Sequence, residues 1–426
     1  MPNLLFLMQR LPYPLIKGEK TRNWKILNYV RQWYDVHFGC LIDDPDDFQH
    51  IDTVRALCAD MFTAPLDRKR AKLTCTTGLL TGEALSVTFF RDRRLQRWVD
   101  DVVRRVKPEM IFVNSSNMTP YILNQPRTGR RVVELGDVDS EKFRSYAETA
   151  GPPMRQIYTR EARLVRALER RVALECDYSV LVSEPEAELF RRHVPEAANK
   201  IVGVSNGVDH QYFSPERDYP APFDPAAGPS YTFTGNMDYR PNVDAVIWFV
   251  NEVLPIVRRA ISNARCFIVG SNPTDEVKRL AKDAGVIVTG RVPDVRPYVF
   301  HATASVSPMR IARGIQNKVL EAMSMAKPIV LTSGALEGID AVPNRDLIVA
   351  DDADSFAASL LRVTGANGAT TPEGDALGQS ARRVILRRYD WDACLRGFDD
   401  LMRPAAPAPS DAPGPSGAAT LTEARA

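Results

Sequence analysis

The sequence predicts an α/β protein with two doubly wound, Rossmann-like domains that face each other across a cleft. Its 426 residues are too many for one compact core and suit two domains of roughly 200 residues each. Short apolar runs alternate with helical patterns, as in parallel sheets whose strands are joined by crossover helices. Residues 214–230 are rich in proline and lack periodicity, so we expect a linker that divides this pattern into two halves.

The composition excludes several classes of protein. Lys and Arg number 55 and Asp and Glu number 53, so charge alone indicates neither a nucleic acid nor an acidic partner. Six widely spaced cysteines favour reduced thiols over a disulfide or zinc framework. The first apolar run is broken by Gln9, Arg10 and Pro12, and no run reaches the ~20 residues of a membrane span. We therefore expect a cytoplasmic protein, with peripheral contact at the inner face of the membrane left open.

The first half of the chain contains the apolar runs of one sheet. We expect strands at residues 4–8, 36–42, 86–90, 110–114, 131–135, 178–183 and 201–206. Charged stretches such as residues 160–176 separate several of these runs and have helical character. Together they predict an N-terminal domain over residues 1–208.

The second half restarts the same pattern. We expect strands at residues 231–235, 265–270, 286–290, 304–309, 328–332 and 347–351. After Pro241, a helix is predicted by one apolar stripe with three- and four-residue spacing: Val246, Phe249, Val250, Val253 and Val257. We assign residues 209–389 to the C-terminal domain. A helix at 390–402 is expected to cross back to the first domain, and the Pro/Ala-rich residues 403–426 are expected to be disordered.

Residues 310–325 carry the clearest signal of a binding site. Ligands of open parallel sheets bind beyond the carboxyl ends of the strands, and here a strand is followed by Gly314, Lys318 and Glu321. We expect a helix from Gly314 to about Met325, whose first amides and dipole favour an anion. Lys318 could pair with phosphate oxygens and Glu321 could accept sugar hydroxyls, as a nucleoside diphosphate requires. A Lys–Glu pair three residues apart is equally common as an ordinary surface pair.

The segment "GIQNKVLEAMSMAKPIVLT" (314–332) resembles the signature of glycosyltransferase family 4. That family has an E-x7-E motif, and its second Glu, which binds the donor ribose, matches Glu321. Arg313 stands at the position of the first Glu, which usually contacts the transferred sugar. The backbone amides around Gly314 and Ile315 are alternative candidates for positioning that sugar.

Other segments resemble the same family in the same order. Residues 288–309 are similar to the segment that frames the nucleotide base, which implies Arg291 and Val292 as donor contacts. Residues 234–255 are similar to the first strand, loop and helix of the nucleotide domain. There the resemblance implies Gly235 and Asn236 as donor contacts and Arg240 as a cation for the diphosphate. Gln316 joins this donor set. The whole series, over residues 4–402, is most similar to sugar transferases associated with PEP-CTERM/exosortase exopolysaccharide loci.

The first domain offers two groups of candidate residues. Between the first strand and the first helix, Gly18 allows close backbone approach, and Lys20 and Arg22 bring positive charge to the helix start. We interpret Gly18 as a donor contact and the two cations as acceptor contacts, against the alternative of a solvated basic turn. Asp137 and Asp139 follow a predicted strand and could bind acceptor hydroxyls or take up the acceptor proton. Helix capping is the competing explanation for Asp139.

The resemblance implies a retaining glycosyltransferase with the GT-B fold. It would move a sugar from a nucleotide-diphospho-sugar to a saccharide or lipid-linked acceptor in exopolysaccharide biosynthesis. Asp137, Lys318 and Arg240 are the predicted catalytic residues. No metal is expected, because cations and a helix dipole can offset the leaving diphosphate's charge. No other cofactor and no nucleic acid are expected either. Two alternatives remain: a non-catalytic scaffold that binds nucleotide-sugar or polysaccharide, and a nucleotide-sugar epimerase.

Overall fold

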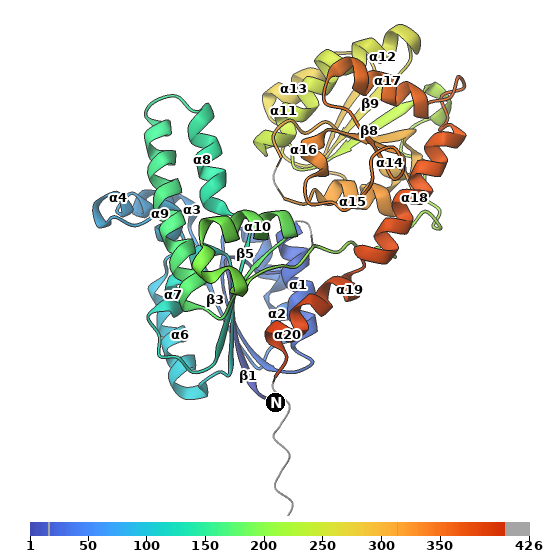
Figure 1. Ribbon diagram of the computed structural model, residues 1–426. Coiled ribbons are helices and arrows are strands. Elements are labelled where there is room, and N and C mark those ends of the chain that lie inside the picture. Colours follow the sequence, from blue (N-terminus) through green and yellow to red (C-terminus); the bar gives the residue numbers. More distant parts are fainter. Residues whose placement is uncertain (16–17, 313, 405–426) are drawn as a thin grey trace, which may run out of the picture.

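The computed structural model describes residues 1–15, 18–312 and 314–404, which build two parallel sheets with helices on both faces (Figure 1). This confirms the predicted fold class. Arg313 and the predicted tail beyond residue 404 lie outside the described residues.

The first sheet has the strand order β3-β2-β1-β4-β5-β6-β7. Its strands are β1 (Asn3–Met8), β2 (Asp35–Ile42), β3 (Asp60–Pro65), β4 (Met110–Asn114), β5 (Arg130–Gly136), β6 (Tyr178–Leu181) and β7 (Ile201–Gly203). Successive residues of β1 alternate between two hydrophobic clusters: Leu5 and Leu7 face one, and Leu4 and Phe6 face the other. Both faces are therefore covered, as parallel sheets require.

Helices of the N-terminal domain pack on these two faces. They are α1 (Gly18–Val30), α2 (Ile51–Arg55), α3 (Arg68–Cys75), α4 (Gly78–Thr81), α5 (Leu85–Phe89), α6 (Arg93–Val106), α7 (Pro120–Leu123), α8 (Asp139–Thr149), α9 (Met154–Glu175) and α10 (Glu184–His193), with the 3-10 turns η1 (Pro45–His50), η2 (Ser116–Met118) and η3 (Pro195–Lys200). Helices α6 and α9 bury apolar residues in one cluster, whereas α1 does so in the other.

The second sheet has the order β10-β9-β8-β11-β12-β13. Its strands are β8 (Ser230–Thr234), β9 (Arg265–Val269), β10 (Val286–Gly290), β11 (Ala304–Ser307), β12 (Ile329–Leu331) and β13 (Ile348–Val349). The helical segments are η4 (Pro225–Ala227), α11 (Arg240–Trp248), the π-helical turn η5 (Phe249–Val253), α12 (Leu254–Ala260), α13 (Asp275–Leu280), α14 (Arg296–His301), α15 (Asn317–Ser324), α16 (Ser333–Leu336), α17 (Ala353–Val363) and α18 (Pro372–Arg388). All five residues of the stripe predicted after Pro241 are buried.

Three local predictions differ from the structure. Residues 86–90, predicted as a strand, form helix α5 instead, because the Glu161 carboxylate of α9 accepts hydrogen bonds from the first amides, Leu85 N (2.8 Å) and Ser86 N (2.7 Å). The edge strand β3 was not predicted, since it is short and ends in Pro65. The helix expected from Gly314 begins at Asn317, and Gly314 adopts a left-handed conformation (φ +66°) before it.

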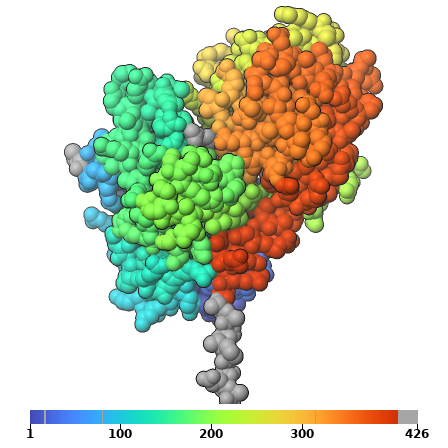
Figure 2. Space-filling model, viewed as in Figure 1, coloured from blue at the N-terminus to red at the C-terminus, as the bar shows by residue number. Residues whose placement is uncertain are grey.

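The chain crosses between the domains twice, and the crossings lie side by side. Val208 N donates to Tyr389 O (2.8 Å), and Val208 pairs with Asp390 in a parallel bridge. Beyond this point α19 (Trp391–Leu395), η6 (Arg396–Phe398) and α20 (Asp399–Met402) pack on the first sheet, where Trp391, Phe398 and Met402 join the cluster of β1 and α1. Figure 2 shows this red C-terminal segment reaching down against the N-terminal domain.

Arg22 of α1 anchors the first crossing. Its side chain is buried, forms an ion pair with Glu134 of β5, and donates to Val204 O (2.8 Å) and Ser205 O (3.0 Å), just before the chain leaves the domain. The guanidinium also lies over the Phe398 ring, at 5.7 Å from its centroid. One buried cation therefore joins α1, β5, the outgoing strand and the returning helix.

Among the helices that the structure describes, none combines the length and apolar character needed to cross a bilayer.

We predict that Arg22→Ala lowers the free energy of unfolding by about 3–5 kcal/mol, because removing one partner leaves Glu134 buried without its counter-charge. Urea unfolding monitored by tryptophan fluorescence measures the change. Lys25→Ala is the matched control: it lies on the same helix, its pair with Asp209 (3.7 Å) is solvent-exposed, and its expected cost is below about 1 kcal/mol. Equal losses in the two variants would contradict the anchoring role.

Candidate functional site

A cavity of about 450 Å³ lies at the carboxyl ends of β1, β4 and β5, where the two domains meet. The N-terminal domain contributes most of its wall, and residues 314–317 of the C-terminal domain close the opposite side. The residues that line the cavity include Gln9, Arg10, Gly18, Arg22, Ser115, Asn117, Asp137, Asp139, Lys142, Gly314, Ile315 and Asn317. Its position is that expected for ligands of open parallel sheets.

Two glycines let the domains approach across this cavity. A Cβ atom on Gly314 would lie 2.5 Å from Asp137 Oδ1, and a Cβ on Gly18 would collide with Nδ2 of Asn317. Gly314 is also constrained by its φ of +66°, which L side chains rarely adopt. Both glycines predicted as donor contacts thus lie where backbone of one domain faces side chains of the other.

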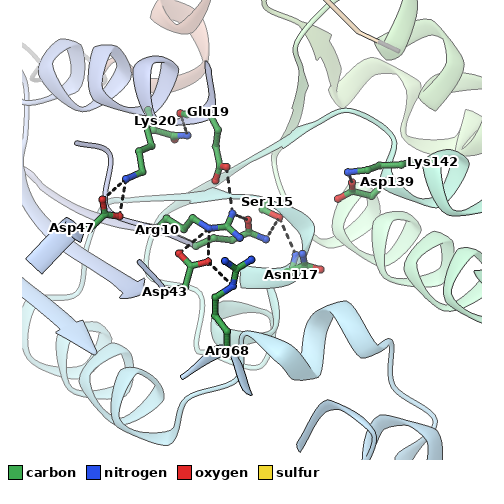
Figure 3. Close-up of polar contacts among 12 residues, drawn as sticks. Arg10, Glu19, Lys20, Asp43, Asp47, Arg68, Ser115, Asn117, Asp139 and Lys142 are labelled. Atoms are coloured by element: carbon green, nitrogen blue, oxygen red, sulfur yellow. Dashed lines mark hydrogen bonds and ion pairs between the residues drawn. The ribbon is translucent and has the colours of Figure 1, made fainter. Parts of the chain in front are cut away.

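Polar side chains at the ends of β1 and β4 hold one another in place (Figure 3). Gln9 Nε2 donates to Ser115 Oγ (2.9 Å), and Ser115 Oγ also accepts from Asn117 N (3.4 Å). Arg10 Nε donates to both oxygens of Asp43 (3.0 Å each). These contacts fix the floor of the cavity, and sequence analysis did not identify any of them.

Asp139 and Lys142 lie on the first turn of α8 at the cavity wall. Their side chains approach to 3.8 Å (Figure 3), and Asp139 also accepts a hydrogen bond from Ser116 Oγ (3.4 Å). Burial raises the pKa of Asp139, opposed by the Lys142 charge. Burial acts to lower the pKa of Lys142, but the carboxylates of Asp139 and Asp137 outweigh it and raise that pKa. The structure therefore adds Lys142 to the two predicted aspartates.

The structure does not bring Lys20 into the cavity. This side chain is 2% exposed, and its ammonium donates to both carboxylate oxygens of Asp47 (2.6 and 2.7 Å; Figure 3). Arg22 does line the cavity, but its guanidinium is engaged by Glu134 and by the backbone of the domain crossing. Both cations were predicted as acceptor contacts; their ion pairs stabilise α1, and neither partner could be identified from local sequence.

Lys318 lies on the first turn of α15, beside the carboxyl end of β8. Its Nζ donates to Asn242 Oδ1 (2.5 Å) and lies 4.4 Å from the centroid of the Phe233 ring. Asn242 Nδ2 in turn donates to Asn236 O (2.9 Å), and a Cβ on Gly235 would be 3.4 Å from Lys318 Nζ. The predicted donor residues Gly235, Asn236 and Lys318 thus meet at one place.

Lys318 and Glu321 share a poorly solvated environment. Burial lowers the pKa of Lys318 to about 7, although the Glu321 carboxylate opposes the shift. Burial also raises the pKa of Glu321 to about 7, opposed by Lys318. A charged ligand that pairs with either group would restore its ordinary ionisation, and such perturbed pairs are typical of functional sites.

The remaining predicted donor residues either follow strands of the second sheet or precede α15. Arg240 is the first residue of α11 and Arg291 follows β10; both are exposed, and within the described residues neither guanidinium makes a hydrogen bond or ion pair. Val292 is half-buried next to Arg291. Ile315 lines the cavity, and Gln316, which precedes α15, donates from Nε2 to Gly314 O (3.3 Å).

Comparisons with known proteins agree with this arrangement. Residues 228–365 match the model of a family described as Glycosyl transferases group 1. No curated protein matches the sequence. Among solved structures, sucrose-phosphate synthase from Thermosynechococcus elongatus is similar at 16% identity, with a TM-score of 0.68 over 94% of this chain and 98% of that chain. HepE from Anabaena, in complex with UDP and glucose, is similar at 12% identity, with a TM-score of 0.63 over 94% and 99%.

A glycosyltransferase from Rickettsia africae also has this fold, at 11% identity and a TM-score of 0.60 over 94% of this chain and 98% of that chain. The structural likeness shows the two-domain GT-B fold. The family match covers the domain that carries Lys318 and Glu321. Together these findings support a glycosyltransferase with the GT-B fold.

Glu169 of α9 supports the cavity wall from behind and generates a pH-dependent prediction. It is 1% exposed and accepts hydrogen bonds from Ser140 Oγ (2.5 Å) and Ser140 N (3.1 Å) at the start of α8. Burial raises its pKa to about 8, with Asp139 adding to the shift while Ser140 and Arg166 oppose it. The folded state therefore holds a proton that the unfolded chain has released.

Because the folded pKa of Glu169 is raised, its contribution to stability falls as pH rises from about 4.5 to about 8. When the pH is raised from 6 to 8, we expect deprotonation of Glu169 to reduce the free energy of unfolding by at most about 2–3 kcal/mol. The limit is 1.36 kcal/mol per pH unit for one proton. Glu169→Gln should remove that loss. Urea unfolding of both proteins at pH 6 and pH 8 tests it, and an unchanged pH dependence in the variant would contradict the assignment.

Proposed function

We propose that the protein transfers a sugar from a nucleoside-diphospho-sugar, bound by the C-terminal domain, to an acceptor bound in the cavity. One observation carries the proposal: Lys318, at the start of α15, lies next to Gly235 and one helical turn before Glu321, and the loop before it places Gly314 against Asp137 of the other domain. A ligand at the start of α15 would therefore lie directly beside a ligand in the cavity.

The chemistry around α15 suits a nucleoside diphosphate. The Lys318 ammonium can pair with phosphate oxygens, and Glu321, three residues further along the helix, can accept the two hydroxyls of a ribose. Arg240 and Arg291 are exposed cations without an ion-pair partner in the described chain, so both are available to the diphosphate or the base. The UDP-bound complexes of HepE favour a uridine nucleotide as the donor.

Transfer requires that negative charge on the leaving diphosphate be stabilised while an acceptor hydroxyl attacks. We assign the stabilisation of the leaving diphosphate to Lys318 and Arg240. Asp137, which lines the cavity, would accept the proton of the attacking hydroxyl. The close approach of the domains at Gly18 and Gly314 would exclude water, which otherwise hydrolyses the donor. Because these charges suffice to offset the leaving group, we expect no requirement for a metal.

The finer assignment rests on the resemblance of the sequence to family 4 transferases. It favours retention of the anomeric configuration and a saccharide or lipid-linked acceptor of exopolysaccharide biosynthesis, as in the PEP-CTERM-associated subgroup. Position 313, where that family has its first Glu, lies outside the described residues. A non-catalytic scaffold remains the alternative, because this chain has Arg there.

Donor binding is tested with a panel of UDP- and GDP-sugars, since a ligand of the folded state raises the melting temperature. For the sugar that binds, Glu321→Ala should weaken the affinity by about 1–3 kcal/mol, or roughly 5- to 150-fold, because a charge-assisted pair of hydrogen bonds is lost. Glu276→Ala, an exposed glutamate of α13, should not change it. Unchanged affinity in Glu321→Ala would remove this residue from the site, and donor binding without release of nucleoside diphosphate would indicate the scaffold.

The pH dependence of donor binding tests Lys318 separately. Because its pKa is lowered to about 7, binding of a diphosphate above pH 7 must be accompanied by proton uptake, and affinity should fall by up to about tenfold per pH unit between pH 7 and 9. The pKa of Glu321 is also raised to about 7, so Glu321 still titrates in the lower half of this range; the Lys318 dependence is therefore read between pH 8 and 9, where Glu321 is ionised. Lys318→Arg keeps its charge, so calorimetry should show a flat profile. A profile shared by both proteins would exclude Lys318 as the titrating group.

A further inference from the structure

The side of the N-terminal domain formed by α3, α4 and the start of α6 combines exposed cations with exposed leucines. We call it the α3 face and define it by its residues: Lys69, Arg70, Lys72, Leu73, Leu79, Arg93 and Arg97. Leu73 is 75% exposed and Leu79 is 49% exposed, and all five cations are exposed. In Figure 1, α4 projects from the side of this domain that is turned away from the C-terminal domain.

The cations of the α3 face are not held in ion pairs with described residues. Among the described residues, none of the five forms an ion pair with a carboxylate. The neighbouring acids are already used: Asp67 accepts from Lys69 N and Arg70 N at the start of α3, and Asp92 caps α6 and holds Arg94. Further along α6, by contrast, Asp101 neutralises Arg104 and Arg105. Along α3 and α6, the exposed cations without an ion pair in the described residues therefore lie on α3 and at the start of α6.

The starts of α3 and α6 are held together. Arg94 Nη2 donates to Pro65 O (3.2 Å), which lies two residues before the Asp67 cap of α3. The two groups of cations therefore belong to one surface. Exposed leucines among clustered cations are typical of a protein surface that lies in a membrane interface, where apolar side chains enter the acyl boundary and cations bind anionic headgroups.

The α3 face is rigidly connected to the wall of the cavity. Thr88 of α5 donates to Cys75 O at the end of α3 (3.1 Å), and Arg160 of α9 donates to Gly78 O (2.5 Å) and Glu83 O (3.1 Å) around α4. Ser86 of α5, and Phe90 directly after that helix, line the cavity itself. A surface that binds the α3 face would therefore lie beside the N-terminal wall of the cavity.

We propose that the α3 face docks the protein on an anionic bilayer surface, with Leu73 and Leu79 inserted at the level of the headgroups. Charge complementarity selects this occupant, because five unpaired cations would face the negative lipid surface. Docking in this orientation would present the cavity to an acceptor carried by a lipid. The inference rests on the surface alone and does not depend on which donor the C-terminal domain binds.

Vesicle flotation of the full chain tests the docking. Vesicles that mix phosphatidylcholine with phosphatidylglycerol should bind the protein at least about tenfold more tightly than phosphatidylcholine alone, and binding should weaken as salt screens the charges. The triple variant K69E/R70E/K72E should lose this binding. K278E/R279E/K282E, which makes the same charge change on exposed residues of the C-terminal domain, should keep it. Equal loss in both variants, or no binding by the wild type, would overturn the proposal.

The leucines distinguish a bilayer from another polyanion. Leu73→Ser with Leu79→Ser should reduce vesicle binding several-fold, because insertion contributes only at a membrane, and should leave binding to heparin unchanged. Vesicle binding that is insensitive to this double substitution would overturn the membrane assignment in favour of a polyanion site. Donor binding by thermal shift is measured in parallel without vesicles, so failure of docking and failure of the proposed transferase function give different results.

Discussion

The structure depends on how closely the carboxyl edges of its two sheets approach each other. At two points the backbone of a glycine in one domain lies against the end of a polar side chain in the other: Gly18 faces Asn317, and Gly314 faces Asp137. A side chain at either position would have to displace the Asn317 amide or the Asp137 carboxylate, and at Gly314 it would also meet a φ of +66° that L side chains rarely adopt. Because both glycines line the cavity, the same contacts that bring the domains together also make the site a shared one.

This approach is also maintained by the paired crossings of the chain, the first of which passes beside the cavity at Asn206. Val208 and Tyr389 hydrogen bond where the two crossings run together, and Arg22 ties the outgoing one to α1 and β5. The returning segments α19 and η6 then bury Trp391 and Phe398 in the first domain's core. We therefore expect any closure of the domains on a substrate to bend the chain near residues 204–209 and 389–391.

The periodic features of the fold could be predicted from sequence, because each depends on nearby residues. The stripe from Val246 to Val257 and the apolar runs of both sheets are such features. Helix α5 could not be predicted, since the carboxylate that caps it belongs to Glu161, 76 residues from Leu85. Arg22 was interpreted as a ligand contact because a cation at a helix start is ambiguous until its buried partner, Glu134, is known. Lys318 and Glu321 stand three residues apart on one helix and could be proposed together from sequence, whereas Asn242, which accepts from Lys318, is 76 residues away and could not.

The central claim is that a nucleoside diphosphate binds at the start of α15, between Gly235 of the C-terminal domain and the cavity of the N-terminal domain. A crystal structure with the bound donor, or with its nucleoside diphosphate, tests this directly. Our proposal predicts the diphosphate oxygens within hydrogen-bond distance of Lys318 Nζ and the ribose hydroxyls at the Glu321 carboxylate. A diphosphate bound elsewhere, or one that leaves Lys318 paired only with Asn242 as in the free protein, would contradict it.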